Sequence, residues 1–113
     1  MNKVQLIGNV GNDPDVKEFD EKKVATFSIA TTEKGYTAQN GTVIPDRTDW
    51  HNIVVWGGLV KVIENFVKKG SQLYVEGKLR TRTWEKEGQK HYSTEIHVDQ
   101  LELLGKPPVG SDK

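Results

Sequence analysis

The 113-residue sequence contains no cysteine and no long apolar segment, and each absence excludes a class of protein. Without cysteine the chain can form neither disulfides nor thiolate metal sites, which is typical of proteins from reducing compartments. Without a run of about 18 apolar residues, or a charged and then apolar leader, neither a membrane span nor a secretory signal is predicted. We therefore expect a cytoplasmic protein that does not associate with membranes.

Motifs for enzyme chemistry are absent as well. The sequence has no phosphate-binding loop of the Walker type, no GxGxxG run and no GxSxG nucleophile elbow. Its histidines, His51, His91 and His97, lack the spacing of metal ligands, so each is expected to be structural. We predict a protein that is not an enzyme and that needs no cofactor and no metal.

Charges balance over the whole chain but not locally. Sixteen basic and 16 acidic residues give a formal net charge of zero. Cations crowd into residues 68–82, where Glu76 is the one acidic residue, whereas acidic side chains gather between Glu85 and Glu102. We therefore expect basic and acidic surfaces on different faces of the molecule.

Hydrophobic periodicity predicts five strands and one short helix. Apolar and polar residues alternate in several segments, and glycine, proline, asparagine and aspartate separate these segments. Residues 33–46 contain such breakers and are expected to form a loop or hairpin that protrudes from the core. The strands are expected at residues 3–10, 24–31, 48–56, 71–84 and 92–104, and the helix at residues 59–67.

A helix between the third and fourth of five strands is typical of the OB-fold, a small Greek-key barrel. A meander sheet with a packed helix is the alternative. Closure of the barrel is favoured because it removes strand edges that an open sheet exposes. We predict an all-β OB-fold domain over residues 1–105, followed by a short flexible C-terminal segment over residues 106–113.

The fourth predicted strand carries cations and an aromatic ring in the same phase. Every second residue from Tyr74 to Trp84 points the same way, so Lys78, Arg80 and Arg82 form a row with about 7 Å between neighbours. A row of cations alone is an ordinary hydrated surface. Its combination with an in-phase indole at the end of the strand favours a binding surface.

Two further tryptophans, Trp50 and Trp56, lie six residues apart on the third predicted strand and therefore share one face. Each of them is a candidate for the core as well as for a ligand platform. A large ring left in water forfeits a few kcal/mol of burial, so exposed indoles call for a partner.

Indole rings beside cations favour single-stranded nucleic acid as that partner. Base stacking contributes roughly 1 to 3 kcal/mol per nucleotide and tolerates any base, and Lys and Arg neutralise phosphates. Two alternatives stay open from the residues alone. The aromatic face could meet another protein, or it could stack on sugar rings, although an oligosaccharide site has no need for the two arginines.

Five segments of the sequence resemble the bacterial-type single-stranded DNA-binding proteins. They are NKVQLIGNVGNDPDV, VATFSIATTE, TDWHNIVVWG, FVKKGSQLYVEGKLRTRTW and YSTEIHVDQLELLG, which follow the family's order and cover nearly all of residues 2–105. The resemblance implies an OB-fold, a homotetramer in which strands of neighbouring protomers pair, and single-stranded DNA wrapped around it. It also implies a role in DNA replication, repair and recombination in the cytoplasm, at the nucleoid.

The resemblance implies particular site residues as well. Tyr36 is the nearest match to a tryptophan in the loop of other members, and His51 falls where the family has a histidine at a subunit contact. The strand alternation adds Lys78 to the DNA-binding set. The positions implied to stack on bases are Trp50, Trp56 and Trp84, and those implied to meet phosphates are Lys3, Lys69, Arg80 and Arg82.

The sequence also departs from the family. Asn52, Gly58 and Thr83 stand where relatives often carry a basic residue, which implies a shallower dependence of DNA binding on salt. A long tail with an acidic, Phe-ended tip does not follow Lys113 in this sequence. Replication and repair proteins are therefore expected as partners only if the chain carries such a tip.

Overall fold

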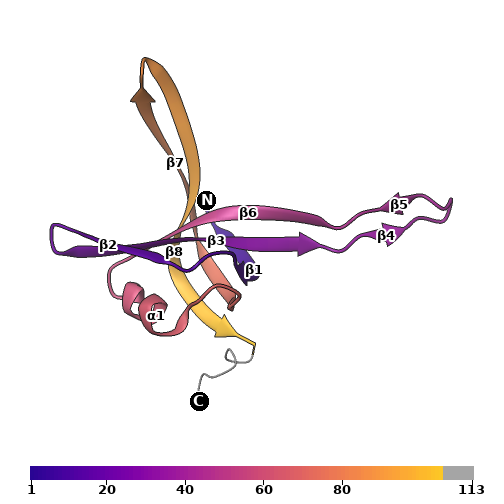
Figure 1. The fold of residues 1–113 in the computed structure, drawn as a ribbon, viewed down its shortest axis with the longest axis horizontal. Helices are drawn as coiled ribbons and strands as arrows, with labels where there is room; N and C mark the ends of the chain where they lie inside the picture. The colour runs from indigo at the N-terminus through magenta and orange to yellow at the C-terminus, as the bar shows by residue number, and fades with distance from the viewer. Residues whose placement is uncertain (106–113) are drawn as a thin grey trace.

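The computed structural model describes residues 1–105 and consists mostly of strands. Three hairpin arms project from a central body, formed by β2 with β3, by β4 with β5, and by β7 with β8 (Figure 1). The predicted segment at residues 106–113 lies outside the described residues. The strands are β1 (Val4–Val10), β2 (Asp15–Phe19), β3 (Lys22–Glu33), β4 (Tyr36–Thr37), β5 (Val43–Ile44), β6 (Arg47–Trp56), β7 (Gln72–Lys86) and β8 (Gln89–Leu104), and α1 (Leu59–Phe66) is a helix.

The central body is a closed barrel. Strands follow the order β1-β7-β8-β6-β3-β2 in one sheet, and β1 also pairs with β3, which closes the first five of them into a ring. β6 and β8 run parallel, whereas the other neighbouring pairs are antiparallel. This is the strand order of the OB-fold, with the helix between the third and fourth barrel strands. The predicted all-β OB-fold is confirmed.

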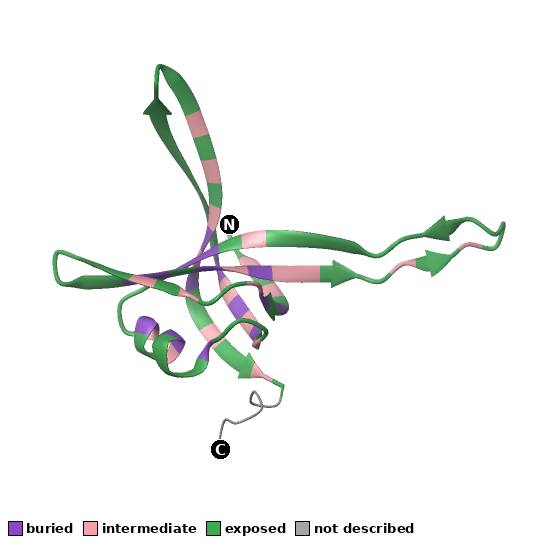
Figure 2. Cartoon of the chain, in the orientation of Figure 1, coloured by how far each residue is buried: buried purple, intermediate pink, exposed green. Residues whose placement is uncertain are grey.

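The core fills the barrel because alternate residues of each strand point inward. Strand β6, for example, turns Ile53 and Val55 inward, and both are buried. The helix closes one end of the barrel with Val60 and Ile63, which are fully buried. Buried segments therefore gather in the body of Figure 2, and the arms are exposed. The buried core consists of Val10, Ala25, Phe27, Ile29, Ile53, Val55, Val60, Ile63, Val67, Leu73, Val75, Ile96 and Val98.

The protrusion predicted as a loop or hairpin at residues 33–46 contains the short hairpin β4–β5. Strand β2 was not predicted, because DVKEF is mostly charged and exposes every residue except the half-buried Val16. The helix ends at Phe66, since Val67 is already extended, with φ −104° and ψ 128°.

Membrane-spanning helices and clusters of metal-binding side chains are both absent from residues 1–105. No helix in this part of the chain is long and apolar enough to cross a membrane; α1 has 8 residues. Within the same residues, no group of three or more His, Cys, Asp or Glu side chains could hold a metal ion.

Candidate nucleic-acid interface

The sheet register brings the predicted site residues from separate strands onto one surface. Arg80 of β7 lies opposite Glu95 of β8, Glu95 opposite Asn52 of β6, and Asn52 opposite Ser28 of β3. Directly opposed residues point to the same side of a sheet, so these strands share one continuous surface, here called the outer face. Its residues are Lys78, Arg80, Arg82 and Trp84 of β7; His91, Ser93, Glu95 and His97 of β8; Trp50, Asn52, Val54 and Trp56 of β6; and Val24, Thr26, Ser28 and Ala30 of β3.

All three tryptophans belong to the outer face and none belongs to the core. Their exposed fractions are 62% for Trp50, 46% for Trp56 and 40% for Trp84. The core alternative that the sequence left open for Trp50 and Trp56 is therefore wrong within the protomer. The result is a surface on which three flat rings are available to a ligand.

The Trp50 ring lies over Gly11, the residue that follows β1. A Cβ atom added to Gly11 would come within 2.2 Å of ring atom Cζ3 and within 2.9 Å of the Ser28 hydroxyl oxygen. Any side chain at residue 11 would therefore push the indole away from its position. Glycine at this turn sets where the Trp50 platform lies.

Trp84 forms a cluster with two neighbours near the tip of the β7–β8 arm. Its ring stacks on His91, with ring centroids 5.7 Å apart and 22° between the planes, and the Arg82 guanidinium carbon lies 5.0 Å from the indole centroid. The guanidinium Nε donates to Glu95 Oε2 at 3.0 Å, and Nη2 forms an ion pair with the same oxygen, also at 3.0 Å. Glu95, whose side chain is 12% exposed, thus holds the Arg82 guanidinium beside the Trp84 ring.

Two histidines that the sequence assigned structural roles lie on this surface. His91 is the stacking partner of Trp84, and His97 Nε2 lies 3.2 Å from Glu95 Oε1. Their alternation with Ser93 and Glu95 along β8 was visible in the sequence. The sequence did not show which residue of β7 lies opposite each histidine, so their place on this surface could not be predicted.

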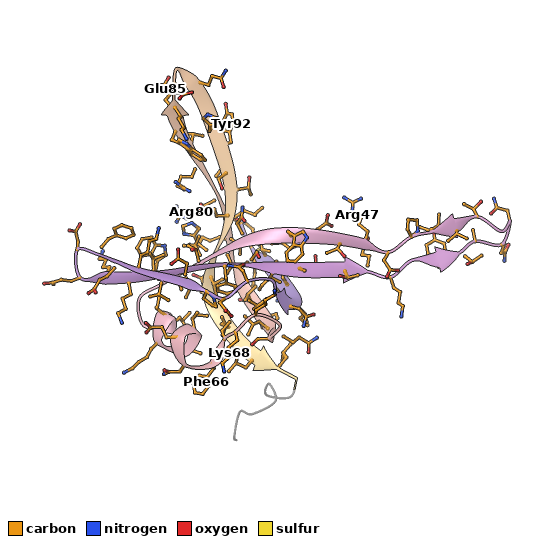
Figure 3. The ribbon with its side chains drawn as sticks, viewed as in Figure 1. Arg47, Phe66, Lys68, Arg80, Glu85 and Tyr92 are labelled. Atoms are coloured by element: carbon orange, nitrogen blue, oxygen red, sulfur yellow. The ribbon has the colours of Figure 1, made fainter. Side chains whose placement is uncertain are left out.

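The cations of the outer face differ in their partners. Arg82 is paired with Glu95, whereas Lys78 and Arg80 make no ion pair within residues 1–105. Arg80 lies where the β7–β8 arm leaves the barrel (Figure 3). Strands β7 and β8 approach each other closely at Gly77, next to a bulge in their register. A side chain at residue 77 would clash with the His97 carbonyl oxygen.

Lys3 lies beside the row of cations, on the segment leading into β1. Its Nζ is 3.2 Å from Glu76 Oε2, and the Tyr74 hydroxyl donates to Glu76 Oε1 at 2.5 Å. The hydrogen bond from Tyr74, followed by the one from Lys3, lowers the pKa of Glu76 below its usual 4.5. The same bond raises the pKa of Tyr74, because loss of the phenol proton would place two anions together.

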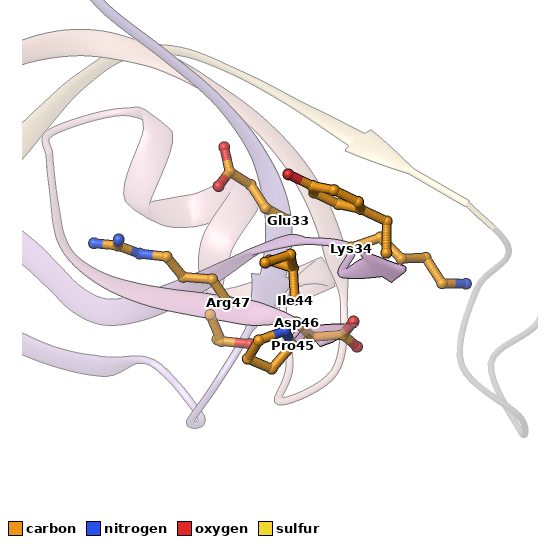
Figure 4. A pocket seen from close by; sticks show the side chains of 8 residues that line it. Glu33, Lys34, Ile44, Pro45, Asp46 and Arg47 are labelled. Atoms are coloured by element: carbon orange, nitrogen blue, oxygen red, sulfur yellow. The ribbon is translucent and has the colours of Figure 1, made fainter. Parts of the chain in front are cut away.

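Three predicted site residues lie apart from the outer face. Tyr36 belongs to the β4–β5 arm and lines a pocket of about 580 Å³ with Ile44 and Pro45 (Figure 4). Lys69 lies between α1 and β7, where its backbone N–H donates to Asp13. His51 is on the opposite side of β6 from Trp50, half-buried, with Nε2 2.8 Å from the Thr31 hydroxyl.

An additional aromatic residue, Phe19, was missed by the sequence analysis. Strand β2 continues the sheet beyond β3, with Asp15 opposite Thr26 and Lys17 opposite Val24, so the side of β2 that carries Phe19 extends the outer face. Phe19 is 54% exposed. The alternation Asp15, Lys17, Phe19 gave no strand signal because the first two residues are charged.

Comparisons with known proteins agree with this geometry. The model of the single-strand binding protein family matches residues 1–104. A single-stranded DNA-binding protein of Bacteroides thetaiotaomicron is 55% identical over 114 residues, which cover 99% of this chain and 70% of the relative. The single-stranded DNA-binding protein 1 of Xylella fastidiosa is 46% identical over 108 residues, covering 94% of this chain and 79% of the relative.

A solved structure is similar to this chain in fold and in sequence. The Plasmodium falciparum SSB in complex with ssDNA is similar with a TM-score of 0.83 and 39% sequence identity, covering 93% of this chain and 96% of that chain. Fold, family model and relatives thus point the same way. The chain belongs to the single-strand binding protein family, whose members bind DNA without catalysing a reaction, and it is not an enzyme.

Proposed function

We propose that this family member binds single-stranded DNA on the outer face, with bases stacked on Trp50, Trp56 and Trp84. The observation that carries the proposal is the register, which sets three exposed indoles and a row of cations on one surface. Stacking needs a base whose flat side is free, so a duplex is excluded and the base sequence matters little.

Phosphates are bound by the cations around these rings. Lys78, Arg80 and Arg82 stand on the strand that carries Trp84, and Lys3 lies at the end of their row. Lys69 and Tyr36 are farther away and would meet a strand that continues past the outer face. Tyr36 offers its ring on an exposed arm, as expected of an outlying stacking residue.

Binding can be tested directly by titrating oligothymidylate into the protein and following tryptophan emission. Stacked bases quench exposed indoles, so we expect saturable quenching that weakens as salt rises. Duplex DNA of the same length should quench weakly. Unchanged emission at low salt with micromolar oligonucleotide would refute the proposal.

A homotetramer is the second part of the proposal. β1 pairs with β3 only through Asn9 and Val10, so within residues 1–105 the edge of β1 that faces away from β7 has no partner strand at residues 4–8. Ile7 on this strand is exposed. A β1 strand from a second protomer would satisfy the edge and cover this side chain. His51 belongs to the same proposal as a subunit-contact residue, and the mass in solution, measured by light scattering, tests it.

The cellular role follows from what a sequence-tolerant binder does. A protein that covers unpaired bases protects single strands and keeps them from pairing during DNA replication, repair and recombination. We place the protein at the nucleoid in the cytoplasm, and assign DNA binding to a domain over residues 1–105. The two alternatives, a protein-interaction module and an oligosaccharide-binding domain, are disfavoured by the family match and by Arg80 and Arg82.

A further inference from the structure

A groove on the outer face reaches from the proposed DNA-binding residues Trp56 and Arg82 to Phe19, which the function proposed above does not use. It measures about 410 Å³, and its lining includes Phe19 of β2, Trp56 of β6 and Arg82 of β7. The residues that line it come from β2, β3, β6, β7 and β8. Its floor is apolar, because Val24 and Val54 line it and are almost fully covered by their neighbours.

Phe19 is held in this groove by regular backbone. The β2–β3 hairpin turns immediately after it through Asp20 and Glu21, whose φ angles of 48° and 67° are those of a tight two-residue turn. The ring therefore projects from a strand position instead of a long loop. A single exposed hydrophobic residue is ordinary on protein surfaces, but this one shares a groove with an exposed indole on a surface that binds DNA.

We propose that this groove is an additional nucleobase subsite, in which Phe19 stacks on a base of the strand that occupies the outer face. The inference rests on the proposed function and extends it by one position. Two features support it: the groove is continuous with the Trp56 platform, and its apolar floor suits an uncharged ring.

The charges around the groove decide which part of the nucleotide enters. The carboxylates of Asp15 and Glu95 line it and would repel a phosphate, whereas a neutral base pays no such penalty. Lys17 and Arg82 also line it, and each is already paired with one of these carboxylates, at 3.9 Å and 3.0 Å. The charges therefore favour an arrangement in which the base enters the groove and the sugar-phosphate backbone of the DNA follows its rim.

The experiment compares ring-removing and ring-keeping variants of the full chain. Phe19→Leu keeps apolar volume and removes the ring, whereas Phe19→Tyr keeps the ring. The matched control is Phe66→Leu, which changes an aromatic side chain of similar exposure, 57%, on α1 (Figure 3). Affinity for oligothymidylate is measured by tryptophan quenching, and thermal unfolding checks each fold.

We expect Phe19→Leu to bind about fivefold or more weakly, while Phe19→Tyr and Phe66→Leu stay within about twofold of the unmodified chain. A peptide containing Phe19 should also crosslink to an oligonucleotide that carries 5-iodouracil. Unchanged affinity of Phe19→Leu, or equal losses in Phe19→Leu and Phe66→Leu, would overturn the subsite and leave the proposed function standing. If the unmodified chain itself does not bind the oligonucleotide, the proposed function falls and the subsite falls with it.

Discussion

The ion pair between Arg82 and Glu95 places a carboxylate on the surface that we propose binds DNA. Glu95 accepts two contacts from the Arg82 guanidinium at 3.0 Å, and its other oxygen lies near His97. The Glu95 carboxylate offsets part of the Arg82 charge, so Arg82 binds a phosphate more weakly than Lys78 or Arg80 does. Glu95→Gln keeps the shape and an acceptor for the guanidinium but removes the charge.

The size of the effect follows from the number of free cations. With Glu95 present, two cations of the outer face, Lys78 and Arg80, have no anionic partner among residues 1–105. Each phosphate that a cation neutralises adds about 0.7 to the slope of log affinity against log salt for a single strand. Release of Arg82 should therefore steepen the slope by about 0.7, which is about a fivefold larger change in affinity for each tenfold change in salt.

The assay is oligothymidylate binding at several salt concentrations for the unmodified chain and for two variants. Glu85→Gln is the matched control, because it removes the same charge from the same arm but on the opposite side of β7 from Trp84. We expect a steeper slope and tighter low-salt binding for Glu95→Gln only. Equal slopes for Glu95→Gln and Glu85→Gln would mean that only total charge matters. A shallower slope for Glu95→Gln would refute the role given to the pair.

Three further outcomes are expected. Trp84→Ala should weaken oligonucleotide binding by about 1 to 3 kcal/mol with little change in thermal unfolding, because the ring lies outside the core. Gly11→Ala should displace the Trp50 indole, so quenching by DNA and affinity both fall while urea unfolding stays close to that of the unmodified chain. The lowered pKa of Glu76 means that its carboxylate stabilises the fold above pH 4.5 and that this contribution is lost as pH falls through the folded-state pKa. Glu76→Gln should therefore flatten the acid side of a stability profile measured by urea unfolding.

Local alternation was enough to predict most of the barrel. The alternation in β6 predicted that Trp50 and Trp56 lie on one face of the strand and that Ile53 and Val55 lie on the other. In the structure the two tryptophans are exposed, and Ile53 and Val55 are buried. The short helix and the protruding hairpin were also visible as changes of period and as clusters of turn residues. Each of these features depends on residues that are close together in the chain. They can therefore be predicted from a single sequence.

The assembly of the outer face could not be predicted in the same way. Whether Trp84 shares a surface with Trp56 depends on the register between β7 and β8 and on the parallel pairing of β8 with β6. The parallel pairing joins residues that are distant in the sequence, such as Asn52 and Glu95. The β7–β8 hairpin is local, but its register depends on where its turn lies. Strand β2 was missed for another reason, since its only half-buried residue is Val16 and hydrophobic periodicity needs more than one. Phe19, which belongs to β2, was missed for the same reason.

Zero net charge is compatible with DNA binding because stacking can supply the larger share of the affinity. One phosphate contact contributes about 0.7 kcal/mol at about 0.2 M salt relative to 1 M, when the salt slope is converted at 1.4 kcal/mol per tenfold. One stacked base contributes about 1 to 3 kcal/mol. In the proposed function, a protomer with three exposed indoles, and with two outer-face cations that are unpaired within residues 1–105, relies mainly on its rings. Acidic side chains elsewhere on the surface then cost little affinity, because the screening length at physiological salt is about 8 Å.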